Sequence, residues 1–193
     1  MWVFGYGSLI WRMDLPYVER RPATVLGFAR RFFQQSPDHR GTPEAPGRVV
    51  TLVPVAGAQL AGVAYRIAEG HQAAVLDALD HREKAGYDRL DIDIAVATTE
   101  GAGDVQTLRA IVYVGRETNP GFLPGSDQEI AEIVASSVGP SGANLEYVER
   151  LSLALAELGA PDPHVDRIAA LARAVVANQA SRCSPRCGGD PPP

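Results

Sequence analysis

The chain has 193 residues, which is enough for one domain with a hydrophobic core. Its formal net charge is −5, and it lacks the dense Lys/Arg clusters of nucleic-acid-binding proteins, so we expect no nucleic-acid partner. The two cysteines, Cys183 and Cys187, lie near the C-terminal end. They are too few for a disulfide framework, and they exclude a thiol nucleophile from the body of the chain.

The apolar run from Trp2 to Trp11 could be a signal peptide or a membrane segment. It has no cationic region before it and no small-residue cleavage site, and polar or small residues interrupt it at Tyr6, Gly7 and Ser8. It is also too short to span a bilayer. We therefore expect a cytoplasmic protein with no membrane partner.

Strands dominate the expected elements of the first third. Met1–Tyr6 is predicted to be a buried strand that ends in a glycine turn, and Ala23–Phe33 a strand interrupted by Gly27. The polar, Gly/Pro-rich stretch Gln34–Gly47 is predicted to be a long loop, which favours a functional role. Two further strands, Arg48–Val55 and Leu60–Ile67, are expected to be joined by a turn around Gly57.

The middle of the chain predicts one helix and two strands. His71–Arg82 has apolar residues at helical spacing, and Gly86 follows as a terminator. Leu90–Val96 alternates apolar and polar residues, as a half-buried antiparallel strand does. A further strand over Gln106–Gly115 and a loop over Arg116–Gly125 complete this part.

The last third predicts helices. Ser126 and Glu129 form a capping box before an apolar helix face, and two more helices are expected over Ser141–Leu158 and Pro163–Asn178. Strands followed by helices indicate an α+β fold, with an antiparallel sheet or barrel flanked by helices. We expect a single domain over residues 1–180 and a disordered tail over 181–193, although the tail cysteines could also form a metal or redox element.

The sequence GYGSL, from Gly5 to Leu9, follows the first strand and is tested against three glycine motifs. Ile10 replaces the last glycine of a dinucleotide fingerprint, no Gly-Lys-Ser/Thr of a P-loop is present, and Ser8 lacks the flanking glycines of a nucleophile elbow. Two interpretations remain. The glycines expose backbone N–H groups that bind a carboxylate or an oxyanion, or they form a plain bend after a strand.

Glu83 is the candidate general acid/base. A carboxylate at a helix C-terminus, near the like charge of Asp80, has its pKa raised, as a group that accepts and returns a proton requires. Alternatively, Glu83 is a solvated side chain between Arg82 and Lys84, whose positive charges lower its pKa.

His39 follows Asp38 in the long loop, which suggests a general base. Neighbours in a chain rarely face each other, so contact with a ligand or ordering of the loop is the more economical interpretation. The four histidines, His39, His71, His81 and His164, show no zinc-binding spacing, and we predict no metal.

Five blocks in this order resemble the ChaC-like γ-glutamylcyclotransferases: VFGYGSLIW, RRFFQQSPDHRGTPEAPGRVVTLV, GVAYRI, LDHREKAGY and GPSGANLEYVERL. The resemblance runs from residue 1 to about residue 165. It implies a small mixed or antiparallel β-barrel with packed helices, no cofactor, and cleavage of the small-molecule substrate glutathione to 5-oxoproline and cysteinylglycine.

The resemblance also implies roles for individual residues. The loop that holds the γ-glutamyl group maps onto Gly5, Tyr6, Gly7, Ser8 and Leu9, with Val3 and Phe4 leading into it, and the catalytic glutamate maps onto Glu83. Arg40 and Arg48, which flank the long loop, are candidate anchors for the substrate carboxylates, or ordinary surface arginines. Tyr113 is a candidate hydroxyl donor to the substrate, or a core tyrosine.

In the implied reaction, the substrate's own α-amine attacks its γ-carbonyl carbon and closes a lactam, so no enzyme nucleophile is needed. Two alternatives keep the fold. The leaving group could be another amine or amino acid, or the chain could bind γ-glutamyl compounds without catalysis. The sequence does not predict the oligomeric state.

Overall fold

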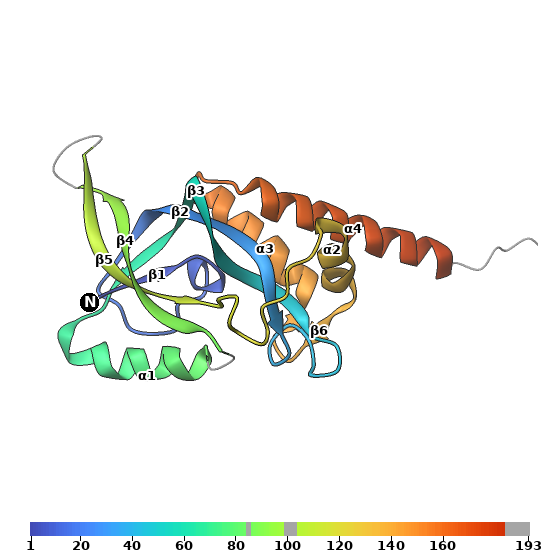
Figure 1. The fold of residues 1–193 in the computed structure, drawn as a ribbon, viewed down its shortest axis with the longest axis horizontal. Coiled ribbons are helices and arrows are strands. Elements are labelled where there is room, and N and C mark those ends of the chain that lie inside the picture. The colour runs from blue at the N-terminus through green and yellow to red at the C-terminus, as the bar shows by residue number, and fades with distance from the viewer. Residues whose placement is uncertain (84–85, 99–103, 184–193) are drawn as a thin grey trace, which may run out of the picture.

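The computed structural model describes residues 1–83, 86–98 and 104–183. Five strands form a closed barrel in the order β1-β3-β2-β4-β5 (Figure 1). Neighbours are antiparallel except β1 and β5, which pair in parallel through Trp2 and Val3. The strands are β1 (Trp2–Gly5), β2 (Glu19–Ser36), β3 (Gly47–Arg66), β4 (Asp88–Ala97) and β5 (Val105–Val114). The predicted α+β fold with a small mixed barrel is confirmed.

Helices cover the barrel on two sides. In Figure 1, α1 lies below the barrel, whereas α2, α3 and α4 gather on the opposite side, where α4 extends beyond the body. Among the described residues, no helix is both long and apolar enough to cross a membrane. The helices are η1 (Ser8–Ile10), η2 (Glu69–His71), α1 (Gln72–Arg82), α2 (Asp127–Ser136), α3 (Asn144–Glu157) and α4 (Pro163–Cys183), and a two-stranded hairpin, β6 (Val138–Gly139) and β7 (Gly142–Ala143), precedes α3.

The predicted turn around Gly57 is wrong. Residues 47–66 form one strand, β3, which pairs with β2 on both sides of an unpaired stretch over residues 55–58. The register shifts between Leu26 and Phe28, where Gly27 has a φ of 80° and Gly57 a φ of 75°. Glycine adopts such angles without a steric penalty, so these two residues form an irregularity that bends a continuous ribbon.

Several predicted boundaries also change. Gln34–Ser36 belong to β2, so the long loop begins at residue 37. A single 3₁₀ turn, η1, begins within the glycine motif at Ser8, where no helix was expected. The capping box of Ser126 and Glu129 is confirmed. α3 begins at Asn144, not at residue 141, and α4 continues to Cys183. The expected tail falls, from residue 184 onward, outside the described residues.

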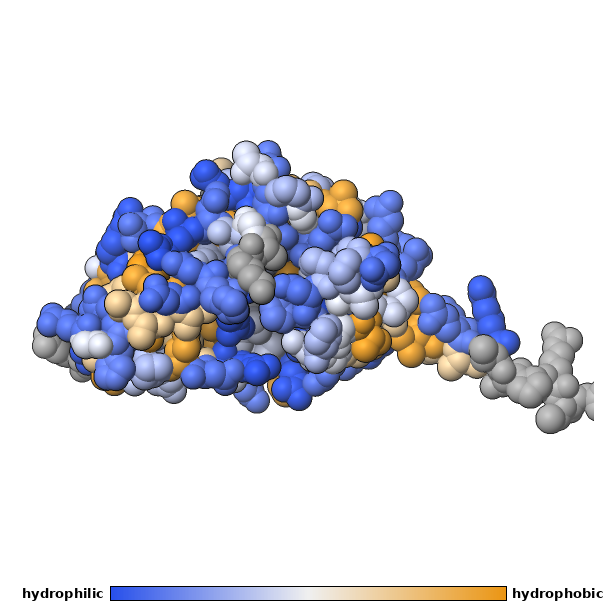
Figure 2. Space-filling model, turned by 90° about the horizontal axis from the view of Figure 1, so that it is seen from below, coloured by the Kyte–Doolittle hydropathy of each residue, from blue (hydrophilic) through white to orange (hydrophobic). Residues whose placement is uncertain are grey.

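One continuous hydrophobic core joins the barrel to the helices. Phe4, Val63 and Val112 are buried in the barrel, and Leu151 and Ile168 bring α3 and α4 into the same cluster. The face of the molecule seen in Figure 2 is mainly hydrophilic, with apolar side chains gathered in small patches. Burial of apolar surface between barrel and helices is therefore the main force that fixes their relative position.

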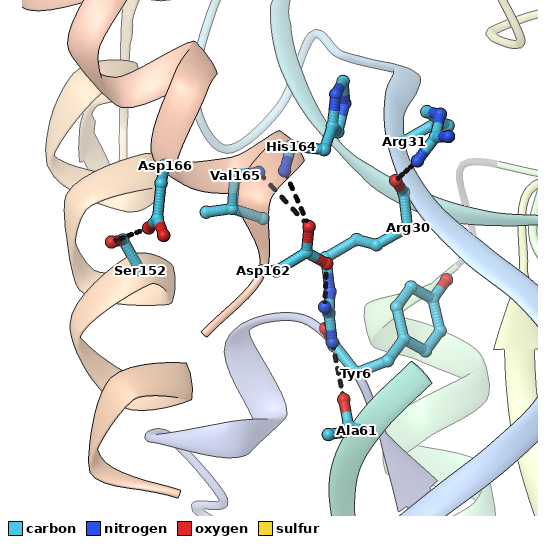
Figure 3. Close-up of polar contacts among 9 residues, drawn as sticks. All are labelled: Tyr6, Arg30, Arg31, Ala61, Ser152, Asp162, His164, Val165 and Asp166. Carbon is cyan, nitrogen blue, oxygen red and sulfur yellow. Dashed lines mark hydrogen bonds and ion pairs between the residues drawn. The ribbon is translucent and has the colours of Figure 1, made fainter. Parts of the chain in front are cut away.

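Arg30 is a charged residue inside this core, with 2% of its surface exposed. Its guanidinium donates to the carbonyl oxygen of Tyr6 at 2.8 Å, to that of Ala61 at 2.7 Å, and to Asp162 Oδ2 at 2.6 Å (Figure 3). A buried charge is tolerated when it is paired and fully hydrogen-bonded, which these three acceptors achieve.

Asp162 also begins the last helix. Its Oδ1 accepts the N–H groups of His164 at 3.0 Å and Val165 at 3.4 Å, as an N-cap residue does (Figure 3). Pro163 occupies the first helical position, where its missing N–H costs nothing. One carboxylate therefore caps α4 and neutralises Arg30.

We predict that Arg30→Ala lowers the free energy of unfolding by ~3–5 kcal/mol, because it leaves Asp162 and two carbonyl groups without their partner. Urea unfolding followed by circular dichroism measures the loss. The control is Arg109→Ala, which removes an exposed pair with Asp93 (3.0 Å) and should change the stability little. Equal losses in the two variants would contradict this interpretation of Arg30.

Candidate active site

A cavity of about 540 Å³ lies where the N-terminal strand, the end of α1 and the start of α3 meet. Segments far apart in the sequence line it: the glycine motif, the end of β2 with the loop that follows, Glu83 after α1, and side chains of α3. Of the predicted site residues, it is lined by Phe4, Tyr6, Gly7, Ser8, Leu9, Arg40, Glu83 and Tyr113.

The glycine motif forms a tight turn at the end of β1. A Cβ atom on Gly5 would lie 2.6 Å from the Cβ of Leu9, so glycine is needed for the chain to fold back there. Gly5 thus has a packing role, and Val3 is fully buried in the core. Neither residue lines the cavity, in contrast to the four residues from Tyr6 to Leu9.

Hydrogen bonds fix the turn from three sides. The Tyr6 hydroxyl donates to the carbonyl oxygen of Tyr113 at 2.7 Å, and the Tyr65 hydroxyl donates to that of Leu9 at 2.6 Å. Within the turn, the Ile10 N–H donates to the Gly7 carbonyl oxygen at 3.0 Å. The N–H groups of Ser8 and Leu9 precede this first intrahelical bond, as do the first donors of any helix.

Glu83 is the C-cap residue of α1, and its N–H donates to the Leu79 carbonyl oxygen at 2.8 Å. Its carboxylate lines the cavity and lies 3.3 Å from Nε of Arg82. The same Arg82 donates from its other end to Ser8 Oγ at 2.7 Å. Arg82 therefore connects the catalytic candidate to the glycine motif, 74 residues away in sequence.

Three influences act on the Glu83 carboxyl. Burial raises its pKa, the Arg82 guanidinium lowers it, and the Asp38 carboxylate, in the same cavity, raises it; the net shift is upward. The direction agrees with the expectation, but Asp80 is not among its causes. The Asp80 carboxylate instead accepts from the Tyr113 hydroxyl at 2.5 Å and pairs with Arg89 at 2.8 Å.

Three tyrosines surround Glu83. Tyr6, Tyr87 and Tyr147 all line the cavity, and burial raises the pKa of each hydroxyl, to about 12 for Tyr147. The Glu83 charge adds to the rise in all three. These hydroxyls therefore stay protonated at neutral pH, so of these four groups the Glu83 carboxyl is the one suited to accept a proton.

Arg40 lies in the cavity wall opposite the glycine motif, on the loop after β2. Its guanidinium carbon lies 5.5 Å above the ring of Tyr147, and Nη1 donates to the Ala143 carbonyl oxygen at 3.1 Å. Burial lowers the Arg40 pKa, and the nearby Glu146 carboxylate raises it. An arginine remains charged under such a shift, so this wall presents a positive charge.

Two other predicted contacts are placed differently. Arg48 does not line this cavity; its guanidinium donates to the Leu123 carbonyl oxygen, and its backbone is held by Asn144. Tyr113 does line the cavity, but its hydroxyl is already bonded to Asp80. The structure therefore brings Arg40, and not Arg48, to the candidate site.

The sequence interpretation missed Tyr87, Glu146, Tyr147 and Arg150, all of which line the cavity. Glu146 and Arg150 form an i,i+4 pair, a pattern typical of a solvated helix face, so their spacing did not indicate a substrate-binding site. Within the described residues, no group of three or more His, Cys, Asp or Glu side chains is arranged to hold a metal ion.

Comparisons with known proteins agree with this architecture. The family described as ChaC-like protein matches residues 1–176. Gamma-glutamylcyclotransferase 2-3 of Arabidopsis thaliana is 40% identical over 88% of this chain and 86% of its own length. Glutathione-specific gamma-glutamylcyclotransferase 1 of Homo sapiens is 38% identical over 91% of this chain and 78% of its own.

A solved structure extends the likeness to the fold. The crystal structure of a γ-glutamylcyclotransferase specific to glutathione from yeast superposes with a TM-score of 0.85 at 31% identity. The match covers 91% of this chain and 96% of the yeast chain. The barrel, the helices on its two sides and the sequence blocks around the cavity show together that the chain belongs to the ChaC-like family.

Proposed function

We propose that this protein is a γ-glutamylcyclotransferase that cleaves glutathione to 5-oxoproline and cysteinylglycine. One observation carries the proposal: Glu83 and the turn Tyr6–Leu9, about 75 residues apart (83 − 8), line the same cavity. A buried carboxyl with a raised pKa beside a glycine turn provides the two functions that the reaction needs, a proton carrier and a holder for the γ-glutamyl group.

In the first step, the Glu83 carboxylate removes a proton from the substrate's α-ammonium group. The freed amine attacks the γ-carbonyl carbon, so that a new C–N bond closes a five-membered ring. The substrate supplies its own nucleophile, and the enzyme's task is to hold amine and carbonyl together. The aromatic wall of Tyr87 and Tyr147 limits the space in which the γ-glutamyl chain can extend.

In the second step, the amide bond to cysteinylglycine breaks. Protonated Glu83 returns the proton to the leaving nitrogen, so the carboxylate is regenerated and the protons balance. While the carbonyl oxygen carries negative charge, backbone N–H groups of the turn Tyr6–Leu9, which lines the cavity, stabilise it. No covalent intermediate with the enzyme forms in this scheme.

The proposal also places the enzyme in the cytoplasm. Its support is that the apolar residues Trp2–Gly5, part of the run that was considered as a signal peptide, form the barrel strand β1. The four arginines and four acidic residues that line the cavity balance each other, which suits a zwitterionic small molecule better than nucleic acid.

We expect Glu83→Gln to reduce 5-oxoproline release from glutathione by about 100-fold or more, because the amide cannot exchange the proton. Chromatographic quantification of 5-oxoproline measures the rate, and circular dichroism checks folding. The control is Asp77→Asn, which removes an exposed carboxylate from the same helix. Turnover by Glu83→Gln at the parent rate would exclude this mechanism and favour a binding module.

The pH dependence of kcat/KM tests the charges around Glu83. Activity should fall as the pH drops through the raised Glu83 pKa, because the protonated carboxyl cannot act as a base. Asp38→Asn removes a like charge and should shift this acid limb to lower pH. Arg82→Gln removes an opposite charge and should shift the limb to higher pH; shifts in the same direction would contradict the assignment.

The leaving group distinguishes glutathione cleavage from a broader γ-glutamyl activity. We expect 5-oxoproline from glutathione and much less from γ-glutamyl-alanine at the same concentration, because the alanine carboxylate lies one residue closer to the scissile bond than the glycine carboxylate of glutathione does. Parallel incubations with each compound measure both rates. Release from γ-glutamyl-alanine alone would assign the enzyme to other γ-glutamyl amino acids.

A further inference from the structure

Charged groups line the cavity in two clusters. In one, Glu83 pairs with Arg82, and the Asp38 charge acts on the Glu83 carboxyl. In the other, Glu146 pairs with Arg40 and Arg150. Tyr147 lies between the clusters, because its ring packs against the Arg40 guanidinium and its hydroxyl is influenced by Glu83. A substrate that spans the cavity therefore meets an excess of acidic groups around Glu83 and an excess of arginines around Glu146.

Glu146 bridges the two arginines of the positive end. Its Oε1 lies 2.9 Å from Nη2 of Arg150, one turn further along α3, and its Oε2 lies 3.7 Å from Nη1 of Arg40. The second distance is too long for a charge-assisted hydrogen bond, so Arg40 is only loosely paired. Two guanidinium groups share one carboxylate, which leaves one positive charge uncompensated.

The side chains around Glu146 differ in how freely they can move. The Arg40 side chain is 11% exposed and is fixed by the Ala143 carbonyl oxygen and the Tyr147 ring. The Glu146 and Arg150 side chains are 45% and 58% exposed, so both can reorient into water. The arrangement thus has one fixed cation and a carboxylate that can leave it.

We propose that Arg40 and Arg150 bind the carboxylate at the leaving-group end of the substrate, and that Glu146 occupies this position until the substrate displaces it. The inference rests on the proposed function and adds to it a subsite that recognises a dipeptide leaving group by its C-terminal carboxylate. An incoming carboxylate can form a closer bond with Arg40 than Glu146 does, and Glu146 then moves toward solvent.

Chemistry decides which carboxylate binds there. The α-carboxylate of a γ-glutamyl group is attached to the same carbon as the amine, so it must stay near Glu83 when Glu83 deprotonates that amine. The glycine carboxylate is separated from the scissile nitrogen by the cysteine and the next peptide bond. It is therefore the carboxylate that reaches the far end of the cavity, past Tyr147.

The first test measures binding without turnover. Glu83→Gln protein is titrated calorimetrically with glutathione and with its C-terminal amide, in which the glycine carboxylate is replaced by a carboxamide. We expect glutathione to bind about tenfold more tightly, because the amide loses its charge-assisted bonds to arginine. Equal affinity, or no binding of glutathione, overturns the subsite.

The second test changes the subsite itself. Glu146→Gln removes the competing carboxylate and should lower the KM for glutathione about threefold, whereas Arg150→Gln should raise it about fivefold. Neither variant should change the KM for the C-terminal amide. If Glu146 merely orients Arg40, Glu146→Gln raises the KM, so the sign of the change decides between the two roles.

A matched pair on the same helix provides the control. Glu149 of α3 pairs with Arg173 of α4 at 3.4 Å and does not line the cavity. Glu149→Gln and Arg173→Gln should leave the KM of both compounds unchanged. Equal effects of Arg150→Gln on glutathione and its amide would overturn the subsite. Absence of 5-oxoproline from the parent, with the binding preference intact, would refute the proposed reaction and leave the subsite standing.

Discussion

The position of the catalytic turn depends on one buried guanidinium. Arg30 holds the carbonyl oxygen of Tyr6, and the same group binds β3 through Ala61 and the start of α4 through Asp162. Taking this charge out of water is costly, and it is compensated only when all three partners are in place. The geometry of the turn at the end of the first strand is therefore coupled to the docking of the last helix. Correct assembly of the barrel with α4 is thus a condition for a functional cavity.

The other half of the site is attached more weakly. Glu83 lies at the end of α1, on the side of the barrel opposite to α4, and Arg82 connects it to the turn through Ser8. The Arg82 side chain has two opposing effects. It places the Glu83 carboxylate next to the turn, and its positive charge lowers the Glu83 pKa, which burial raises. Asp38 raises the Glu83 pKa and so offsets part of the Arg82 effect. The Glu83 pKa therefore depends on these two neighbouring charges as well as on burial.

Local patterns predicted the elements, whereas the partners in the site depended on the three-dimensional arrangement. The capping box at Ser126 and the helix before Glu83 follow from short-range spacing, and the structure confirms both. The ribbon around Gly57 was misinterpreted because a glycine with positive φ suits a bend within a strand as well as a turn. Arg30 could not be recognised, because nothing in its neighbourhood indicates that a strand arginine points inward. The combination of Glu83 with the glycine turn came from the resemblance of five blocks and not from residue chemistry.

A substrate that carries its own nucleophile shifts the enzyme's task from chemistry to placement. In the proposed mechanism Glu83 moves one proton, and the same proton returns at the end of the cycle, so the rate depends on how often the amine meets the γ-carbonyl carbon. A flexible tripeptide is best positioned when it is held at both ends, since each fixed end removes conformations that do not react. The two charged clusters of the cavity, one around Glu83 and one around Glu146, provide two such ends, with Tyr147 between them. The arginines that bind the leaving group would then contribute to the closure of a ring in which they take no direct part.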